Sequence, residues 1–170
     1  MSKTMTLTLQ KSVIMDAVKA DTHIKGTIDK SADGNASVVA YNETAGDDAH
    51  HERKLDRTLV SSTEKLVSEI SDMLSGNSNV SSSYTGTTVV ITVGVDSRFN
   101  SSFSDTLSRL CSEYITNTML ELWWITINGN LSQSYGSIAS TILTSIRKCF
   151  NKVAPSDPEQ TLLDTKGSIV

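Results

Sequence analysis

The histidines are the first residues in this chain whose type could support metal binding or acid–base chemistry. His50 and His51 form the only histidine pair in the 170-residue sequence, and Glu52 follows them directly. Adjacent side chains on a helix point about 100° apart, so they cannot readily chelate one metal as a pair spaced by three or four residues can. We therefore interpret this pair as the solvated start of a helix.

Other polar residues with catalytic potential lack the partners that such chemistry requires. His23 lies near Asp16 and Asp21, with which it could form an ion pair, but no nucleophile is close to it in the sequence, so we interpret it as an ordinary surface histidine. The serines at 81–83 lack a Gly-x-Ser-x-Gly elbow, and the carboxylates at 47–48 lack the spacing of a calcium loop. We expect no catalytic residue, no cofactor and no metal site, and hence no enzyme.

Cysteine usage and charge restrict the classes of partner. Cys111 and Cys149 fall on apolar stripes of expected helices, where a free thiol behaves as a small hydrophobe, and their spacing leaves open whether they approach each other. The net charge of −4 argues against a surface that neutralises phosphates. The first ten residues lack the continuous apolar core expected of a signal peptide, and no apolar run approaches about 20 residues. We expect synthesis in the cytoplasm and neither a specific nucleic-acid partner nor a membrane partner.

The N-terminal part is expected to form a strand, a helix and a loop. Strict alternation of threonine with apolar residues predicts a strand at 4–9. Apolar residues at three- and four-residue spacing then predict a helix at 11–28. The apolar stripe of this helix contains Val13, Ile14, Ala17, Val18, Ile24 and Ile28. Small and acidic residues predict a flexible loop at 29–50, in which 38–41 could form a short strand.

A second helix and a hairpin follow the loop. The stripe of leucines and isoleucines from 48 to 74 predicts a long amphipathic helix. Strands at 80–84 and 87–95 flank Thr85-Gly86, which is the signal of a hairpin. The centre of the second strand, 89–91, is continuously apolar, which predicts that this strand is buried on both faces.

Two closing helices complete the expected body. Ser102-Phe103-Ser104-Asp105 has the form of a capping box and predicts the start of a helix at 102–127. A break of three polar and glycine residues separates it from a helix at 131–150, so these two helices should be antiparallel neighbours. We expect both to pack against the strands at 4–9 and 87–95.

Together these elements predict a single α+β domain at 1–153. It should contain a helical body of about four helices, a small antiparallel sheet and the flexible loop at 29–50. Pro155 and Pro158 bar a further helix, so residues 154–170 are expected to form an extended C-terminal arm.

Tryptophans and the arm supply the candidate interface residues. Trp123 and Trp124 are adjacent, and two consecutive rings on a helix cannot both face one narrow stripe. One ring could lie in a subunit interface, or one could fill the core while the other lies under the loop or the tail. The arm is either an assembly segment or a plain disordered terminus. Its apolar anchors are Leu162, Leu163, Ile169 and Val170.

The opening Thr-x-Thr-Leu-Thr-Leu strand from Thr4 to Leu9, followed by Lys11-Ser12 and an amphipathic helix, supports a resemblance. With the order of the later elements, it resembles small proteins that phages and prophages of gut Bacteroidales, including crAss-like phages, encode next to their virion genes. The resemblance covers about 150 residues by element order and supplies no functional motif.

The resemblance implies a structural virion protein of a tailed phage. Its most specific form is a ring subunit of the head-to-tail connector or neck, synthesised in the bacterial host cytoplasm and assembled as a homo-oligomer with portal or neighbouring ring proteins. The alternative is a cytoplasmic protein-binding or regulatory module without catalysis.

Overall fold

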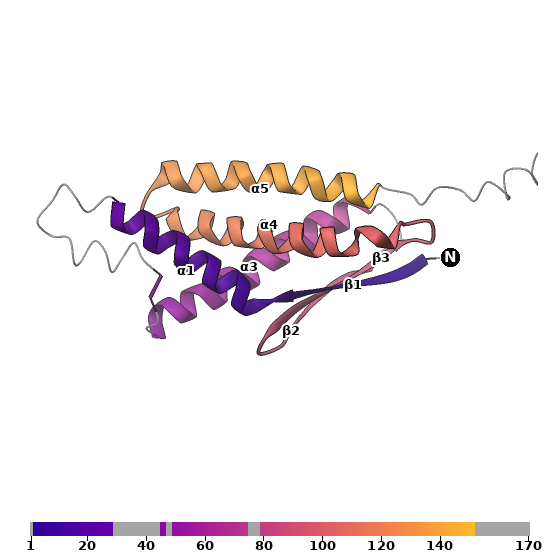
Figure 1. Cartoon of the computed structure of the whole chain (residues 1–170), viewed down its shortest axis with the longest axis horizontal. Helices are drawn as coiled ribbons and strands as arrows, with labels where there is room; N and C mark the ends of the chain where they lie inside the picture. The colour runs from indigo at the N-terminus through magenta and orange to yellow at the C-terminus, as the bar shows by residue number, and fades with distance from the viewer. Residues whose placement is uncertain (1, 29–44, 47–48, 75–78, 152–170) are drawn as a thin grey trace, which may run out of the picture.

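The computed structural model describes residues 2–28, 45–46, 49–74 and 79–151, and within them the chain has the expected α+β fold. The predicted loop at 29–50, apart from Ala45, Gly46, Ala49 and His50, lies outside the described residues, as do the candidate strand at 38–41 and the arm at 154–170. Figure 1 shows the elements in chain order: β1 (Ser2–Gln10), α1 (Lys11–Ile28), α3 (Ala49–Met73), β2 (Val80–Tyr84), β3 (Thr88–Asp96), the 3-10 turn η2 (Ser101–Phe103), α4 (Ser104–Trp124) and α5 (Gly129–Phe150).

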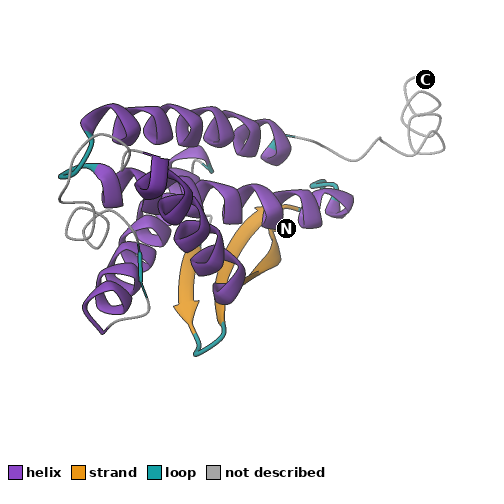
Figure 2. Cartoon of the chain, turned by 60° about the vertical axis from the view of Figure 1, so that its left-hand side comes forward, coloured by secondary structure: helices purple, strands orange, loops and turns teal. Residues whose placement is uncertain are grey.

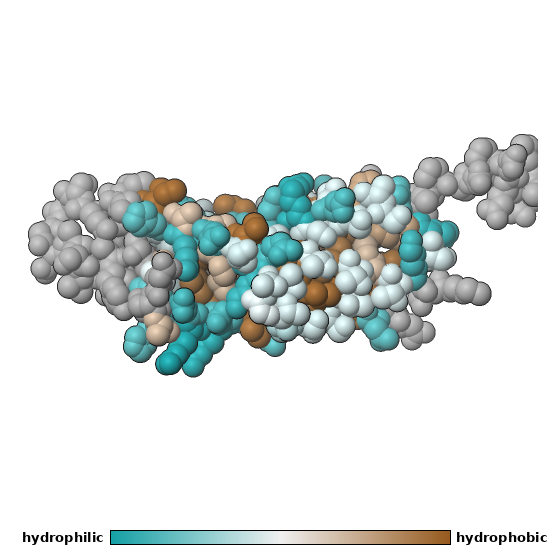
Figure 3. All heavy atoms as spheres, turned by 60° about the horizontal axis from the view of Figure 1, so that its bottom comes forward, coloured by the Kyte–Doolittle hydropathy of each residue, from teal (hydrophilic) through white to brown (hydrophobic). Residues whose placement is uncertain are grey.

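The described sheet has the antiparallel order β1-β3-β2, so β3 is the central strand. Its residues alternate between buried and half-buried, so the prediction that β3 is buried on both faces is wrong. The strands gather on one side of the helices (Figure 2), and the other face of the sheet meets solvent. Figure 3 shows that side of the molecule, where a pale area reflects small polar residues. The residues of this open face are Thr4, Thr6, Thr8, Ser81, Ser83, Val90, Thr92 and Gly94.

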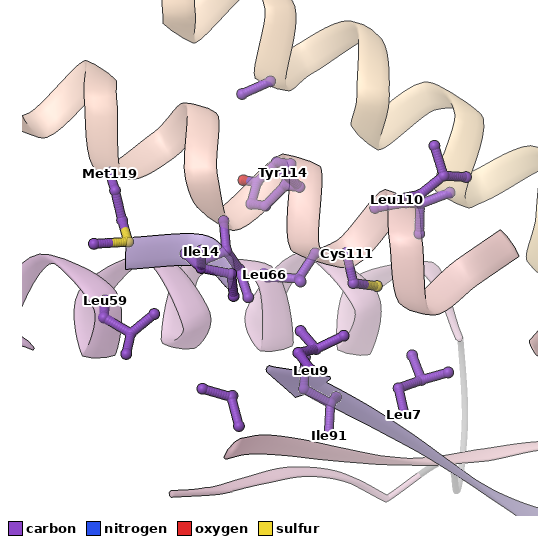
Figure 4. Packing of buried hydrophobic residues seen from close by; sticks show 14 of the residues in the cluster. Leu7, Leu9, Ile14, Leu59, Leu66, Ile91, Leu110, Cys111, Tyr114 and Met119 are labelled. Atoms are coloured by element: carbon purple, nitrogen blue, oxygen red, sulfur yellow. The ribbon is translucent and has the colours of Figure 1, made fainter. Parts of the chain in front are cut away.

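Helix α4 occupies the centre of the molecule, because its apolar residues extend over most of its circumference. It packs against β1, α1, α3 and α5. Figure 4 shows Leu7, Leu9 and Ile91 of the sheet facing this central layer. Helix α5 lies on the side of α4 that is turned away from the sheet (Figure 1), so the prediction that α5 packs on the strands is wrong. Among the described helices, none has the length and apolarity needed to cross a membrane.

Asparagine side chains cap the starts of the turn η2 and of α5. Asn100 Oδ1 accepts from the backbone N–H of Ser102 at 3.1 Å, and this bond caps η2 ahead of α4. The capping box predicted at 102–105 is therefore wrong, because Ser102 already belongs to the 3-10 turn. Asn128 Oδ1 accepts from the Leu131 N–H at 3.2 Å and starts α5. The short connection makes α4 and α5 antiparallel neighbours, as predicted (Figure 1).

Candidate protein-interaction surface

The outer edge of β1 is the first feature of this surface. The Gly94 N–H donates to the Asn79 carbonyl at 2.9 Å, so the backbone N–H and C=O groups of the even-numbered residues of β3 point toward β2. Since backbone groups alternate in direction along an antiparallel strand, the odd-numbered residues of β3 must bond to β1. The register then turns the backbone groups of Thr4, Thr6 and Thr8 outward. Within the described sheet β1 has no second neighbour, so these groups form an open edge.

A groove of about 480 Å³ lies beside the C-terminal end of this edge, between β1, α1 and α4. We call it the β1 groove. Val13, whose exposed fraction is 61%, and Ala17 line it from α1, and Leu9 lines it from β1. The remaining lining residues are Thr8, Gln10, Ser108, Arg109, Ser112, Glu113, Thr116 and Asn117.

The wall that α4 contributes is less polar than its residue types imply. Thr116 Oγ1 donates to the Ser112 carbonyl at 2.9 Å, and Asn117 Nδ2 donates to the Glu113 carbonyl at 2.8 Å. Thr116 and Asn117 therefore each direct a side-chain donor to a carbonyl of their own helix. Arg109 Nη1 and Glu113 Oε1 lie 2.7 Å apart and both are well exposed. A surface ion pair of this kind contributes little to stability, so Arg109 can exchange its partner at low cost.

Both tryptophans are buried within the single chain. The exposed fractions are 1% for Trp123 and 2% for Trp124. The His51 ring meets Trp123 edge-on at 5.4 Å between centroids, and Lys54 Nζ lies 4.0 Å above the Trp123 ring, where burial lowers the pKa of Lys54. This burial favours a core role for both rings over a place for either in a subunit interface. The other candidate interface residues, Leu162, Leu163, Ile169 and Val170, lie outside the described residues.

The two adjacent histidines have different environments. His50 is exposed, whereas His51 is buried and its Nδ1 accepts from the Gly46 N–H at 2.9 Å. The interpretation of the pair as a solvated helix start is therefore wrong for His51. Ala45 N–H also donates to Thr22 Oγ1, at 3.0 Å, so residues 45–46 are held between α1 and the start of α3. Sequence reasoning missed this role because residues 45–46 are held in place partly by Thr22, which lies 23 residues before Ala45 in the chain.

Replacing His51 by Ala should lower the free energy of unfolding by about 1–3 kcal/mol, because the Gly46 N–H loses its acceptor and Trp123 loses a ring contact. Urea denaturation followed by circular dichroism would measure the loss. The matched control is His50→Ala, which should stay within about 0.5 kcal/mol of the parent. Equal losses for the two variants would contradict the buried role of His51.

A polar cluster joins α1 to α5. The Tyr135 hydroxyl donates to Asp21 and accepts from Lys25, whose Nζ lies 3.3 Å from Asp21 Oδ1. Burial, with the hydrogen bond to Asp21, holds the pKa of Tyr135 well above its usual range, so the phenol stays protonated. Asp21 therefore bonds Lys25 and Tyr135. His23, which lies two residues after Asp21 in the sequence, is exposed. Because Asp21 and Tyr135 lie 114 residues apart, no local pattern could have indicated this cluster.

The two thiols are free, and Cys111 is buried while Cys149 is half-buried. Burial, reinforced by the neighbouring Cys149, raises the pKa of Cys111 to about 12. Cys111 is therefore a protonated core residue and a poor nucleophile at neutral pH.

The remaining candidate residues are the serines at 81–83 and the carboxylates at 47–48. The serines at 81–83 lie on β2, and the carboxylates at 47–48 lie outside the described residues. Among the residues that the structure describes, no three His, Cys, Asp or Glu side chains gather in a way that could hold a metal ion. Compared with protein-family models, curated proteins and solved structures, the chain has no match.

Proposed function

We propose that the chain is a non-catalytic assembly subunit that acts through contacts with further copies of itself and with neighbouring proteins. The observation that carries this proposal is the open edge of β1 beside the β1 groove. β1 is nine residues long, and a strand edge of that length presents unpaired N–H and C=O groups that can template another strand. Addition of an extended segment to such an edge, with side chains in an adjacent pocket, is a recurring mode of protein recognition.

In its specific form, the proposal is a ring subunit of the head-to-tail connector or neck of a tailed-phage virion. Portal or neighbouring ring proteins would be its other partners, and it would reach the virion after synthesis in the host cytoplasm. The sequence resemblance from Thr4 to Ser12 supports this identity. A ring also requires a head-to-tail interface between two different patches of each subunit, which an edge strand that receives a separate segment can provide.

Size-exclusion chromatography with light scattering on the full chain tests self-assembly, and negative-stain electron microscopy tests ring closure. We expect the mass to rise with protein concentration and closed rings to appear in the images. A mass that stays at one chain over the whole concentration range would contradict self-assembly. That result would favour the alternative, a protein-binding or regulatory module that folds alone.

A further inference from the structure

We infer that the β1 groove receives residues 159–170 of a second copy of the chain, which add as an antiparallel strand to the open edge of β1. This inference rests on the proposed self-assembly and names the two patches that meet. It requires a proline-free extended segment, an aliphatic side chain for the groove and a carboxylate that replaces Glu113 as the partner of Arg109.

The backbone requirement is met by this segment. The outward N–H and C=O groups of Thr4, Thr6 and Thr8 need a chain that supplies a donor and an acceptor at alternate residues. Proline lacks the donor, and both prolines of the chain, Pro155 and Pro158, precede the segment.

The side-chain requirement fixes the register. Side chains alternate along a strand, so Leu162 and Asp164 project from the same side of the segment. With that side toward α4, Leu162 enters the apolar part of the groove at Val13 and Asp164 approaches Arg109. A shift by one residue would place Leu163 in the groove but would turn Asp164 away from Arg109.

The direction in which the segment runs along β1 indicates whether it comes from the receiving chain itself or from a second copy. β1 and α4 run in the same direction (Figure 1), with Arg109 near the start of α4 and Val13 beyond the end of β1. A segment that passes Val13 before Arg109 therefore runs antiparallel to β1. Phe150, at the end of α5, contacts Phe99 at 6.2 Å between centroids, near the start of β1. The shortest path from a chain's own α5 would thus run parallel to β1, which makes a second copy the better donor.

Photo-cross-linking in a mixed population tests the inference. One population is labelled with ¹⁵N and carries a benzophenone amino acid in place of Leu162, and it is mixed with unlabelled full-length chain. Mass spectrometry then identifies the cross-linked peptides. We expect cross-links that join labelled to unlabelled chains within residues 4–17 or 108–117.

Variants of the unlabelled, receiving chain test each part of the site. Val13→Arg should fill the groove, and Thr6→Pro should remove an outward N–H without touching the bonds to β3. Each should reduce the cross-link yield at least about tenfold, which corresponds to about 1.4 kcal/mol of binding. Thr6→Val keeps the N–H, and Ile125→Arg changes a residue as exposed as Val13, at 60% against 61%. Both controls should leave the yield unchanged.

A charge exchange tests the register. Asp164→Lys in the donor and Arg109→Glu in the receiver should each lower the yield, and the two together should restore it. Cross-links confined to single chains, or located elsewhere while light scattering still shows assembly, would overturn this inference and leave the proposed function standing. Absence of any assembly would overturn both.

Discussion

Trp123→Ala should lower the free energy of unfolding by about 3–5 kcal/mol, the largest loss that we expect from a single substitution. The ring is 1% exposed and contacts the His51 ring and the Lys54 ammonium, so its removal leaves a cavity where the end of α4 packs against the start of α3. A loss of this size is a large share of the stability of an ordinary domain. Urea denaturation of the full chain, followed by circular dichroism and by tryptophan fluorescence, would measure it.

The matched control is Ile125→Ala at the end of the same helix. Ile125 is 60% exposed, so its truncation should change the free energy of unfolding by no more than about 0.5 kcal/mol. If Trp123→Ala were as stable as Ile125→Ala, the ring would not be a core residue and would again be a candidate for a subunit interface.

The free energy of unfolding should fall by about 4 kcal/mol between pH 9 and pH 12 because of the ionisation of Cys111 alone. In the folded chain the pKa of Cys111 is raised from 9.0 to about 12, so the native thiol stays protonated while the unfolded thiol ionises. The stabilising contribution is therefore complete below pH 9 and is lost as pH rises toward 12. The expected slope is about 1.4 kcal/mol per pH unit over that interval.

Urea denaturation at several pH values from 8 to 11, with a reducing agent present, would measure this slope for the parent and for Cys111→Ala. Tyr114 and Tyr135 also have raised pKa values, so the difference between the parent and the variant isolates Cys111. Cys149→Ala is the matched control and should retain most of the slope. Parallel stability curves for the parent and Cys111→Ala would show that the thiol is not buried.

The elements themselves were predictable because their signals are local. The helix at 11–28 matches α1 at both ends, and the alternation at 4–9 gives both the existence of β1 and its buried face. The hairpin of β2 and β3 followed from the turn residues between them. The start of α4 was less predictable, since Asn100 Oδ1 accepts from both the backbone N–H and the hydroxyl of Ser102 and so places Ser102 inside the turn η2 ahead of α4.

The apolar run in β3 could not show whether the strand is buried on one face or on both. A continuous run shows only that a strand tolerates burial, and the number of layers that form decides whether burial occurs. Here every described helix lies on one side of the sheet, and α5 stacks on α4 instead of covering the second face. Because α4 is buried over most of its circumference, Trp123 and Trp124 both enter the core, although adjacent residues point in different directions.

The sequence by itself determined the α+β class, the order of the elements and the absence of a recognisable catalytic motif, because periodicity, turn residues and motif spacing are properties of short segments. Only the tertiary structure decided which apolar residues remain uncovered. Ile14 and Val18 are buried, whereas Val13, from the same predicted stripe, is exposed in the β1 groove. A stripe at three- and four-residue spacing is wider than the contact made by one neighbouring helix, so its margin is buried only where another element covers it.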